Sequence, residues 1–157
     1  MLIDLLPLTS SDQSLIWEML YQAIYVPPGT EPPAKSILEV PDIAQYAAGW
    51  GRDGDMGLKA LDNGTPVGAA WLRLIQGYGH VAGDIPELTI AVLPADRGQG
   101  IGTELLKELI DIASQCYGGI SLSVVGDNPA MRLYEKLGFQ IVEADGASYT
   151  MLLRMDE

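Results

Sequence analysis

An apolar segment followed directly by closely spaced glycines is the feature that most constrains this chain. Residues 87–93 read Glu-Leu-Thr-Ile-Ala-Val-Leu, and a short turn leads through Arg97 to glycines at positions 98, 100 and 102. Glycine has no Cβ, so the backbone there can approach a ligand closely. A helix that starts at these glycines has unpaired N–H groups and a positive dipole end. The stretch therefore predicts a strand, a turn and a helix whose start binds a phosphate or pyrophosphate.

Two common phosphate-binding patterns do not fit these glycines. The P-loop pattern places a lysine directly after its last glycine, and no lysine occurs between Gly98 and Leu106. The dinucleotide pattern Gly-x-Gly-x-x-Gly would place its third glycine on Thr103 or Leu105. What remains is Arg-Gly-x-Gly-x-Gly over residues 97–102.

The remaining pattern resembles the pyrophosphate-binding motif of the GNAT superfamily, the acetyl-CoA-dependent N-acetyltransferases. A second segment, Asn-Pro-Ala-Met-Arg-Leu-Tyr-Glu-Lys-Leu-Gly-Phe at residues 128–139, is similar to the C-terminal acetyl-CoA motif of the same superfamily. Val-Leu-Pro at 92–94 and the Ser- and Val-rich residues 121–125 also fit. The resemblance covers residues 87–139, and at 157 residues the chain is expected to be one domain of this kind, residues 1–157.

Composition limits the partners and the location of the protein. The formal net charge of −12 disfavours nucleic acid, whose binding depends on Lys and Arg at the phosphates. The acidity either steers cationic partners or only aids solubility. The single cysteine excludes an internal disulfide and gives no metal cluster. The first residues lack the basic segment of a signal peptide, and no apolar run reaches the roughly 20 residues of a membrane helix. We therefore expect a cytoplasmic protein without a membrane partner.

Periodicity and turn residues predict the element order β-α-α-β-β-β-α-β-α-β-β. Strands are expected at 2–6, 56–61, 66–75, from 87, and at 120–125, 139–142 and 148–153, and helices at about 11–25, 41–49, 100–116 and after 128. The resemblance implies that these elements form an α/β (α+β) GNAT fold: a mixed, mostly antiparallel central sheet of about six or seven strands, splayed in its middle and flanked by about four helices.

Local signals refine four of these elements. Ser10 or Ser11 is expected to cap the first helix, with Leu15, Met19 and Ala23 on one face. Asn63-Gly64 is a strong hairpin signal, and the glycines at 77, 79 and 83 suggest a flexible connection. The helix at 100–116 should bury Ile101, Leu105, Leu109 and Ile112, widened by Leu106 and Ile110, with Cys116 packed. Asn128 should cap the last helix, which Gly138 closes.

The resemblance implies two sets of site residues. Acetyl-CoA, the co-substrate, should bind through Val92, Leu93, Arg97, Gly98, Gln99, Gly100, Ile101, Gly102, Thr103, Asn128 and Tyr134. At Val92 and Leu93 the central strand should bulge and free an N–H for the thioester carbonyl. Tyr134 should give a proton to the departing sulfur, and Glu87 should act as a general base. The alternatives are a glycine-rich helix start with a solvated arginine, a core tyrosine, a helix-capping asparagine and a solvated strand-end glutamate.

The resemblance implies that residues 25–50 and the loop at 76–85 determine the acceptor, which should bind opposite the cofactor. Tyr25, Glu31, Glu39, Tyr46 and Trp50 could line a pocket for an amine. His80 is either a base or an exposed loop residue, and the latter is favoured. Acyl-enzyme chemistry at the cysteine is disfavoured because no histidine pairs with it.

The function expected from the resemblance is N-acetyl transfer from acetyl-CoA to a primary amine, by direct attack in a ternary complex. The acceptor would be a small-molecule or peptide amine, no metal is expected, and a homodimer is left open. The alternative is a non-catalytic acyl-CoA-binding or sensing module. A third hypothesis is an acyltransferase that uses a different donor, such as a longer acyl-CoA.

Overall fold

Seven strands form one sheet in the order β1-β2-β3-β4-β5-β7-β6 in the computed structural model, which describes residues 3–155. The strands are β1 Ile3–Pro7, β2 Met56–Asp62, β3 Thr65–Arg73, β4 Glu87–Val92, β5 Gly119–Val125, β6 Gln140–Asp145 and β7 Ser148–Arg154. The helices are α1 Gln13–Ala23, α2 Pro41–Ala44, α3 Ile101–Ala113 and α4 Ala130–Lys136, with 3-10 turns at Ser10–Asp12, Lys35–Glu39 and Pro94–Asp96. This order is the predicted one.

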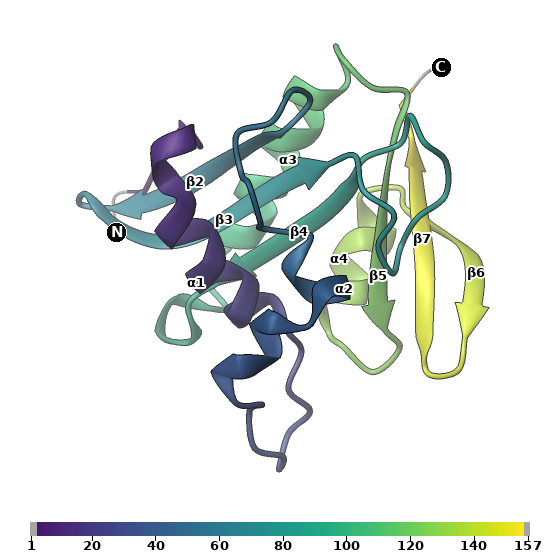
Figure 1. Cartoon of the computed structure of the whole chain (residues 1–157), viewed down its shortest axis with the longest axis horizontal. Helices are drawn as coiled ribbons and strands as arrows, with labels where there is room; N and C mark the ends of the chain where they lie inside the picture. The colour runs from purple at the N-terminus through teal and green to yellow at the C-terminus, as the bar shows by residue number, and fades with distance from the viewer. Residues whose placement is uncertain (1–2, 156–157) are drawn as a thin grey trace.

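The sheet divides between its two middle strands. All other neighbouring strands pair antiparallel, whereas β4 and β5 are parallel and share a single register pair, Glu87 with Ser121. Beyond that pair the two strands diverge (Figure 1). The predicted mixed, mostly antiparallel and splayed sheet is therefore confirmed.

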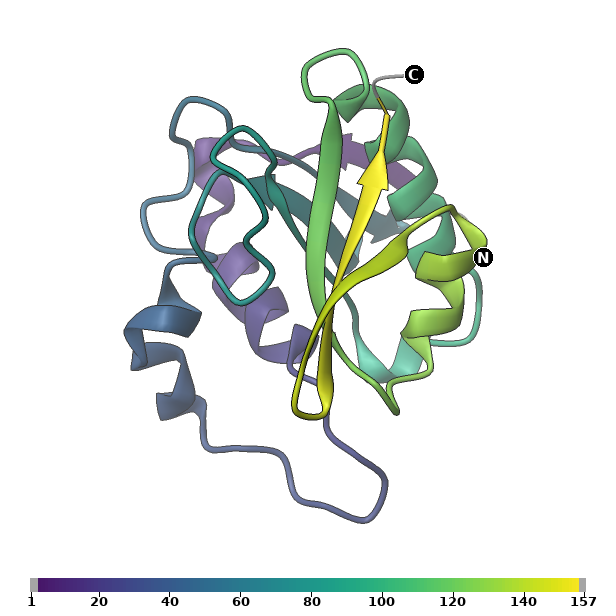
Figure 2. The ribbon, with the colours of Figure 1, turned by 90° about the vertical axis from the view of Figure 1, so that its right-hand side faces the viewer.

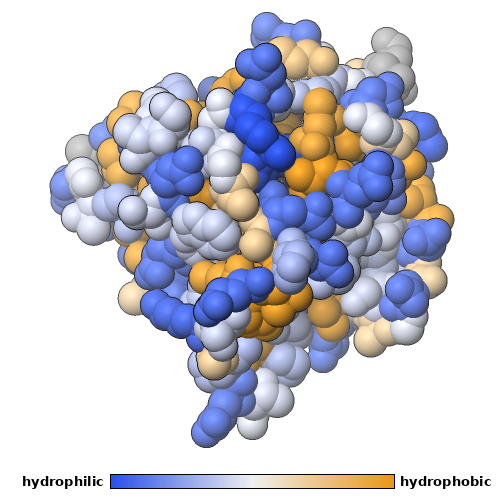
Figure 3. Space-filling model, viewed as in Figure 1, coloured by the Kyte–Doolittle hydropathy of each residue, from blue (hydrophilic) through white to orange (hydrophobic). Residues whose placement is uncertain are grey.

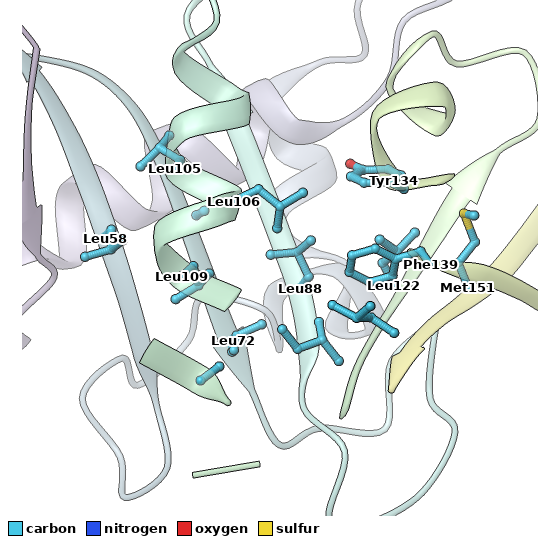
Figure 4. Packing of buried hydrophobic residues seen from close by; sticks show 14 of the residues in the cluster. Leu58, Leu72, Leu88, Leu105, Leu106, Leu109, Leu122, Tyr134, Phe139 and Met151 are labelled. Atoms are coloured by element: carbon cyan, nitrogen blue, oxygen red, sulfur yellow. The ribbon is translucent and has the colours of Figure 1, made fainter. Parts of the chain in front are cut away.

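The helices cover both faces of the sheet. Side chains alternate between faces along a strand, so β3 sends Trp71 toward the cluster that contains α1, and Leu72 toward the cluster that contains α3. Figure 2 shows α1 and α2 on one side of the sheet and α3 and α4 on the other. The larger core lies between the sheet and α3 with α4, where Leu105, Leu106 and Leu109 of α3 pack on the strands (Figure 4).

The first helix begins differently from the prediction. Thr9, rather than Ser10 or Ser11, is the capping residue: its hydroxyl accepts from the Ser11 N–H, and Asp12 accepts from the Thr9 N–H at 2.8 Å. A 3-10 turn at Ser10–Asp12 precedes α1. The buried residues of α1 are Ile16, Met19 and Leu20, whereas Leu15 and Ala23 of the expected face are only partly buried.

The second and third helices also end earlier than predicted. The expected helix at 41–49 is helical only over Pro41–Ala44 and continues as turns. In α3 the residues that face the sheet are spaced by four: Ile101, Leu105, Leu109 and Ala113 are buried. Ile112, which was predicted to be buried in place of Ala113, is 39% exposed. Cys116 lies beyond the end of α3 and is exposed, not packed.

Three turn predictions are confirmed. Asn63 and Gly64 both have positive φ, 50° and 87°, between β2 and β3, as a tight hairpin requires. The Asn128 side chain accepts from the Ala130 N–H at 2.9 Å at the start of α4, although Pro129, expected at the first helical position, occupies the N-cap position. Gly138, with φ of 104°, ends that helix. The last hairpin is longer than predicted, because β6 continues to Asp145.

Candidate functional site

A cavity of about 190 Å³ opens where β4 and β5 diverge. Strand separation leaves a gap in the sheet, and elements from both faces contribute to its walls. Figure 3 shows hydrophobic residues exposed near the middle of the face that carries α1 and α2. The lining consists of apolar side chains, three tyrosines and a few small polar groups: Leu20, Ala23, Ile24, Ile43, Tyr46, Tyr78, Leu88, Thr89, Ile90, Leu122, Ser123, Val124, Asn128 and Tyr134.

The start of α3 has the features of an anion site. Gly98 and Gly100 have φ values of 77° and 83°, and a Cβ on either would meet no other atom within 4 Å. Gly100 is the N-cap, no side chain caps the helix, and Glu104 makes the first N–H bond back into the turn. The amides of residues 101–103 are thus left for an external acceptor. Gly102 lies against β4, since its Cβ would be 3.7 Å from Val92.

Arg97 connects the end of β4 to the end of α1. Its Nε donates to the Val92 carbonyl at 2.8 Å and its Nη2 donates to the Gln22 carbonyl at 3.3 Å. The side chain is exposed. The guanidinium is therefore held beside the glycine loop, and it is not simply solvated.

The expected bulge at Val92 and Leu93 is absent. The β3–β4 register runs without a shift from Gly68 with Val92 to Arg73 with Glu87, and the Leu93 N–H donates to the Val67 carbonyl at 2.8 Å. Hydrogen bonds alternate sides along a strand, so the N–H and C=O of Val92 point away from β3. The N–H of Val92 is thus available on the side where β5 has diverged, because the strands separate and not because of a bulge.

Tyr134 reaches the cavity from α4. Its ring packs on Phe139, with ring centroids 5.8 Å apart, and it belongs to the core cluster. Its hydroxyl makes no hydrogen bond to another residue within the described chain, and the side chain lines the cavity. In Figure 4 the hydroxyl oxygen lies on the side of the ring toward Leu88 of β4. Burial raises the pKa of Tyr134 to about 12, so the hydroxyl keeps its proton at neutral pH.

Glu87 is buried, with 1% of its surface exposed, so the solvated strand-end reading is wrong. Its Oε1 accepts from the Tyr46 hydroxyl at 2.8 Å and the Gly79 N–H at 2.9 Å, and its Oε2 accepts from the Gly77 N–H at 2.6 Å. A carboxylate offers about four lone-pair sites, and three are used. Glu87 does not line the cavity, whereas Tyr46, which bonds to it, does.

The connection around Gly77 and Gly79 is tightly packed and not flexible. A Cβ on Gly77 would overlap Tyr46 and lie 2.7 Å from the Glu87 carboxylate. A Cβ on Gly79 would lie 2.6 Å from the Leu122 backbone of β5. Glycine is therefore required at both positions because other groups come too close. Only Gly83 of this stretch has open space around it.

Arg73 is a buried residue that supports the segment carrying Tyr46, and it is not among the residues predicted from the sequence. It is 1% exposed and forms an ion pair with Asp55 at 3.0 Å. It also donates to the carbonyls of Gln45 at 2.9 Å and Ala48 at 2.7 Å. The sequence feature that could have indicated its burial is a single charge at the end of the apolar run Ala-Ala-Trp-Leu. This run lies in a strand that should pair with the Glu87 strand.

The expected acceptor residues divide into three groups. Tyr46 lines the cavity and stacks on Tyr78, with ring centroids 6.4 Å apart and planes at 10°. Tyr25 donates to the Asp127 carbonyl at 3.2 Å, and Trp50 is buried in the smaller core. The remaining two, Glu31 and Glu39, are exposed and outside the cavity lining.

His80 is an exposed loop residue whose Nδ1 lies 3.2 Å from the Ile75 carbonyl. In the part of the chain that the structure describes, no group of three or more His, Cys, Asp or Glu side chains is placed to hold a metal ion. Nor does any helix between residues 3 and 155 have the length and apolar character of a membrane span.

Comparison with known proteins identifies the family. The model of the acetyltransferase (GNAT) family matches residues 17–139. The chain belongs to the acetyltransferase (GNAT) family. A mycothiol acetyltransferase of Brachybacterium faecium is 30% identical to it, over 72% of this chain and 34% of the relative. The matches cover between 22% and 57% of the lengths of the curated relatives, so less than two thirds of each.

Solved structures share the fold at low sequence identity. The ribosomal-protein-S18-alanine N-acetyltransferase of Escherichia coli gives a TM-score of 0.71 at 21% identity, covering 99% of this chain and 96% of that one. A GNAT superfamily phosphinothricin acetyltransferase of Sinorhizobium meliloti, solved with acetyl-CoA, gives 0.68 at 21%, covering 98% and 89%. These likenesses establish the GNAT fold for this chain.

Proposed function

We propose that this protein transfers an acetyl group from acetyl-CoA to a primary amine, by direct attack in a ternary complex. The observation that carries the proposal is the tyrosine-lined cavity at the gap between β4 and β5, whose lining comes from elements on both faces of the sheet. The open start of α3 follows the end of β4 in the chain. Membership of the acetyltransferase family supports the same reaction. The proposal treats residues 1–157 as one domain, since elements near both ends of the described chain belong to one sheet.

The donor would bind along the α3 side of the gap. The amides of residues 98–103, with Arg97 beside them, suit the pyrophosphate of acetyl-CoA. The Val92 N–H, which points away from β3, suits the thioester carbonyl or the adjoining pantetheine. Leu93 would contribute contact only, because its N–H is already bonded. Asn128, which lines the cavity, would contact the pantetheine while its side chain also caps α4.

The chemistry requires one bond to form and one to break. The neutral amine nitrogen attacks the thioester carbonyl carbon, the carbon–sulfur bond breaks, and the nitrogen releases one proton, so that an amide and the free thiol result. The proton released by the nitrogen would restore the Tyr134 hydroxyl after that group has protonated the sulfur. Tyr134 would donate its proton to the departing sulfur, since its raised pKa keeps it protonated. A donor near the carbonyl oxygen would stabilise the charge that develops there.

The amine must lose a proton before or during attack. An alkylamine has a pKa near that of lysine, about 10.4, and is mostly protonated at neutral pH. Glu87 is the proposed base, but the geometry allows no direct contact with the cavity. The proton would travel through Tyr46, which lines the cavity and whose hydroxyl donates to Glu87 at 2.8 Å. Deprotonation in solution is the alternative.

Amine-dependent thiol release tests the proposed function. The protein would be mixed with acetyl-CoA and a panel of primary amines, and both free thiol and the amide product would be measured. We expect thiol release that depends on the amine and equals the amide formed. Saturable acetyl-CoA binding without release for any amine would contradict transfer and favour the non-catalytic acyl-CoA-binding module.

A further inference from the structure

We propose that the acceptor is an amine with one positive charge whose neighbouring group is apolar or aromatic and uncharged, and that Tyr46 and Tyr78 select it. This inference rests on the proposed acetyl transfer and names the acceptor class of that reaction. It follows from three properties of the cavity wall opposite α3: the absence of ionisable groups other than tyrosine, a stacked pair of rings of which one is exposed and one half-buried, and hydrogen bonds that support the pair from behind.

The first property is the charge of the lining. Among the residues that line the cavity, the polar side chains are Thr89, Ser123, Asn128 and the tyrosines, and none is Asp, Glu, Lys, Arg or His. A second ammonium on the acceptor would lose water without gaining a carboxylate, and a carboxylate on the acceptor would lose water without gaining a cation. Polyamines and free amino acids are therefore poor matches for this cavity.

The second property is the aromatic pair. Tyr46 and Tyr78 stack with their planes at 10°, and Tyr78 is 57% exposed. Ile24 and Ile43 line the cavity with them. An apolar group on the acceptor could cover part of the exposed ring surface, and an ammonium near the ring face would be attracted by its quadrupole. The pair thus suits both ends of an arylalkylamine.

The third property is the support that holds the pair. The Tyr46 hydroxyl donates to Glu87 and accepts from the Tyr78 N–H at 2.9 Å. Glu87 also holds the N–H groups of Gly77 and Gly79. Burial and the nearby Glu87 carboxylate raise the pKa of Tyr46, so this hydroxyl stays a donor. The Tyr46 ring and the backbone of Tyr78 are therefore held in place before the acceptor arrives, which lowers the entropic cost of binding.

The segment that carries Tyr46 is fixed from a second direction. Arg73 donates to the Gln45 carbonyl, and the indole N–H of Trp71 donates to the Tyr46 carbonyl at 2.8 Å. Gln45 in turn donates to the Gln76 carbonyl at 3.3 Å and so connects the two segments of the wall. The backbone and side chain of Tyr46 are thus held by separate groups.

Matched acceptor pairs test the charge rule. 2-Phenylethylamine and phenylalanine differ by one carboxylate, and butylamine and 1,4-diaminobutane differ by one ammonium. We expect kcat/KM to be at least about tenfold higher for the first member of each pair, and 2-phenylethylamine to exceed butylamine. Equal or better use of phenylalanine or the diamine would overturn the inference while leaving acetyl transfer intact. A panel without any acetylated amine would overturn both.

Substitution of Tyr78 tests the role of the rings. Its backbone N–H, not its side chain, bonds to Tyr46, so Tyr78→Ala removes the ring and leaves the support in place. We expect the KM for 2-phenylethylamine to rise about tenfold or more, with a smaller rise for butylamine and an unchanged KM for acetyl-CoA. Tyr78→Phe should keep the preference for the aryl amine. Val81→Ala, an exposed position of the same loop outside the cavity, is the control. An unchanged KM for 2-phenylethylamine in Tyr78→Ala would overturn the assignment.

Discussion

Arg73 and Glu87 are direct register partners on β3 and β4, both are 1% exposed, and both point to the face of the sheet that carries α1 and α2. Both form hydrogen bonds to the segment that carries Tyr46, and each also bonds to a second part of the chain. Arg73 holds residues 45–49 and Asp55, and Glu87 holds Tyr46 and the loop at 77–79. Two buried charges at the edge of the gap thereby position one wall of the cavity.

Glu87→Gln separates support from base catalysis. The amide keeps the shape but places an NH₂ group near donors, so we expect a loss of about 1–3 kcal/mol in unfolding free energy. Loss of support should raise the acceptor KM at every pH, with the KM for acetyl-CoA unchanged. Loss of a base should lower kcat most near neutral pH, with partial recovery as pH rises and free amine accumulates. Steady-state kinetics across pH measures both effects.

Each outcome for Glu87→Gln contradicts one role. An unchanged acceptor KM would contradict the support of Tyr46 and the loop. A kcat deficit of the same size at neutral and alkaline pH would contradict proton acceptance by Glu87.

Tyr134→Phe tests the proposed acid. The hydroxyl makes no hydrogen bond within residues 3–155, so the thermal midpoint should change little. We expect kcat to fall by about 10²–10⁴-fold, the usual range for general acid catalysis, with acetyl-CoA affinity preserved. Because the pKa of Tyr134 is raised to about 12, wild-type kcat should show no loss of this acid up to pH 10.0, the ordinary pKa of tyrosine. Wild-type turnover in the Phe variant, with chemistry rate-limiting, would remove Tyr134 from the mechanism.

Arg73→Met should be strongly destabilising. It leaves the Asp55 carboxylate buried without its cation, and such a break in a buried ion pair costs about 3–5 kcal/mol. Chemical denaturation gives the unfolding free energy. Arg52→Met is the matched control, because the Arg52 side chain is exposed and only its backbone N–H contacts Asp55. Similar losses in the two variants would show that the ion pair contributes little.

Gly100→Ala tests the donor site, with Gly29→Ala as its control. Both glycines have φ of 83°, and a Cβ added to either would meet no atom within 4 Å. The backbone strain caused by alanine should therefore be alike at the two positions. Only Gly100 lies at the start of α3, where a methyl group would project toward the pyrophosphate. We expect the Kd for acetyl-CoA to rise at least about tenfold for Gly100→Ala, equivalent to about 1.4 kcal/mol, and to stay unchanged for Gly29→Ala. Calorimetric titration measures both, and equal affinities would contradict the assigned site.

The sequence predicts the features whose causes are local. Asn63-Gly64 and Asn128 act within a few residues, so the hairpin and the start of α4 are readable from the chain. The order of helices and strands is predictable for the same reason, because it depends on the periodicity and turn residues within each short segment. Helix boundaries are less predictable, since the 3-10 turn before α1 rests on a capping box at Thr9 that the Ser-Ser pair obscures.

Features with distant causes were not predictable. The Tyr46–Glu87 bond joins residues 41 positions apart, and Arg73 meets Asp55 across 18. Glycines at 77 and 79 look flexible in sequence, but they are needed because Glu87 and β5 pack against them. The prediction of a bulge at Val92 was wrong, since β3 and β4 pair without a register shift. The Val92 N–H is free because β5 separates from β4, and this separation is not visible in the sequence.

The initial-rate pattern with both substrates varied is the most direct test of transfer at this site. Direct attack requires acetyl-CoA and the amine to be bound together in the gap between β4 and β5. We predict that double-reciprocal plots for acetyl-CoA at several fixed 2-phenylethylamine concentrations intersect, and that acetyl-CoA alone leaves the mass of the protein unchanged. Parallel lines with an acetylated protein, or a rate that does not depend on the amine, would contradict the account.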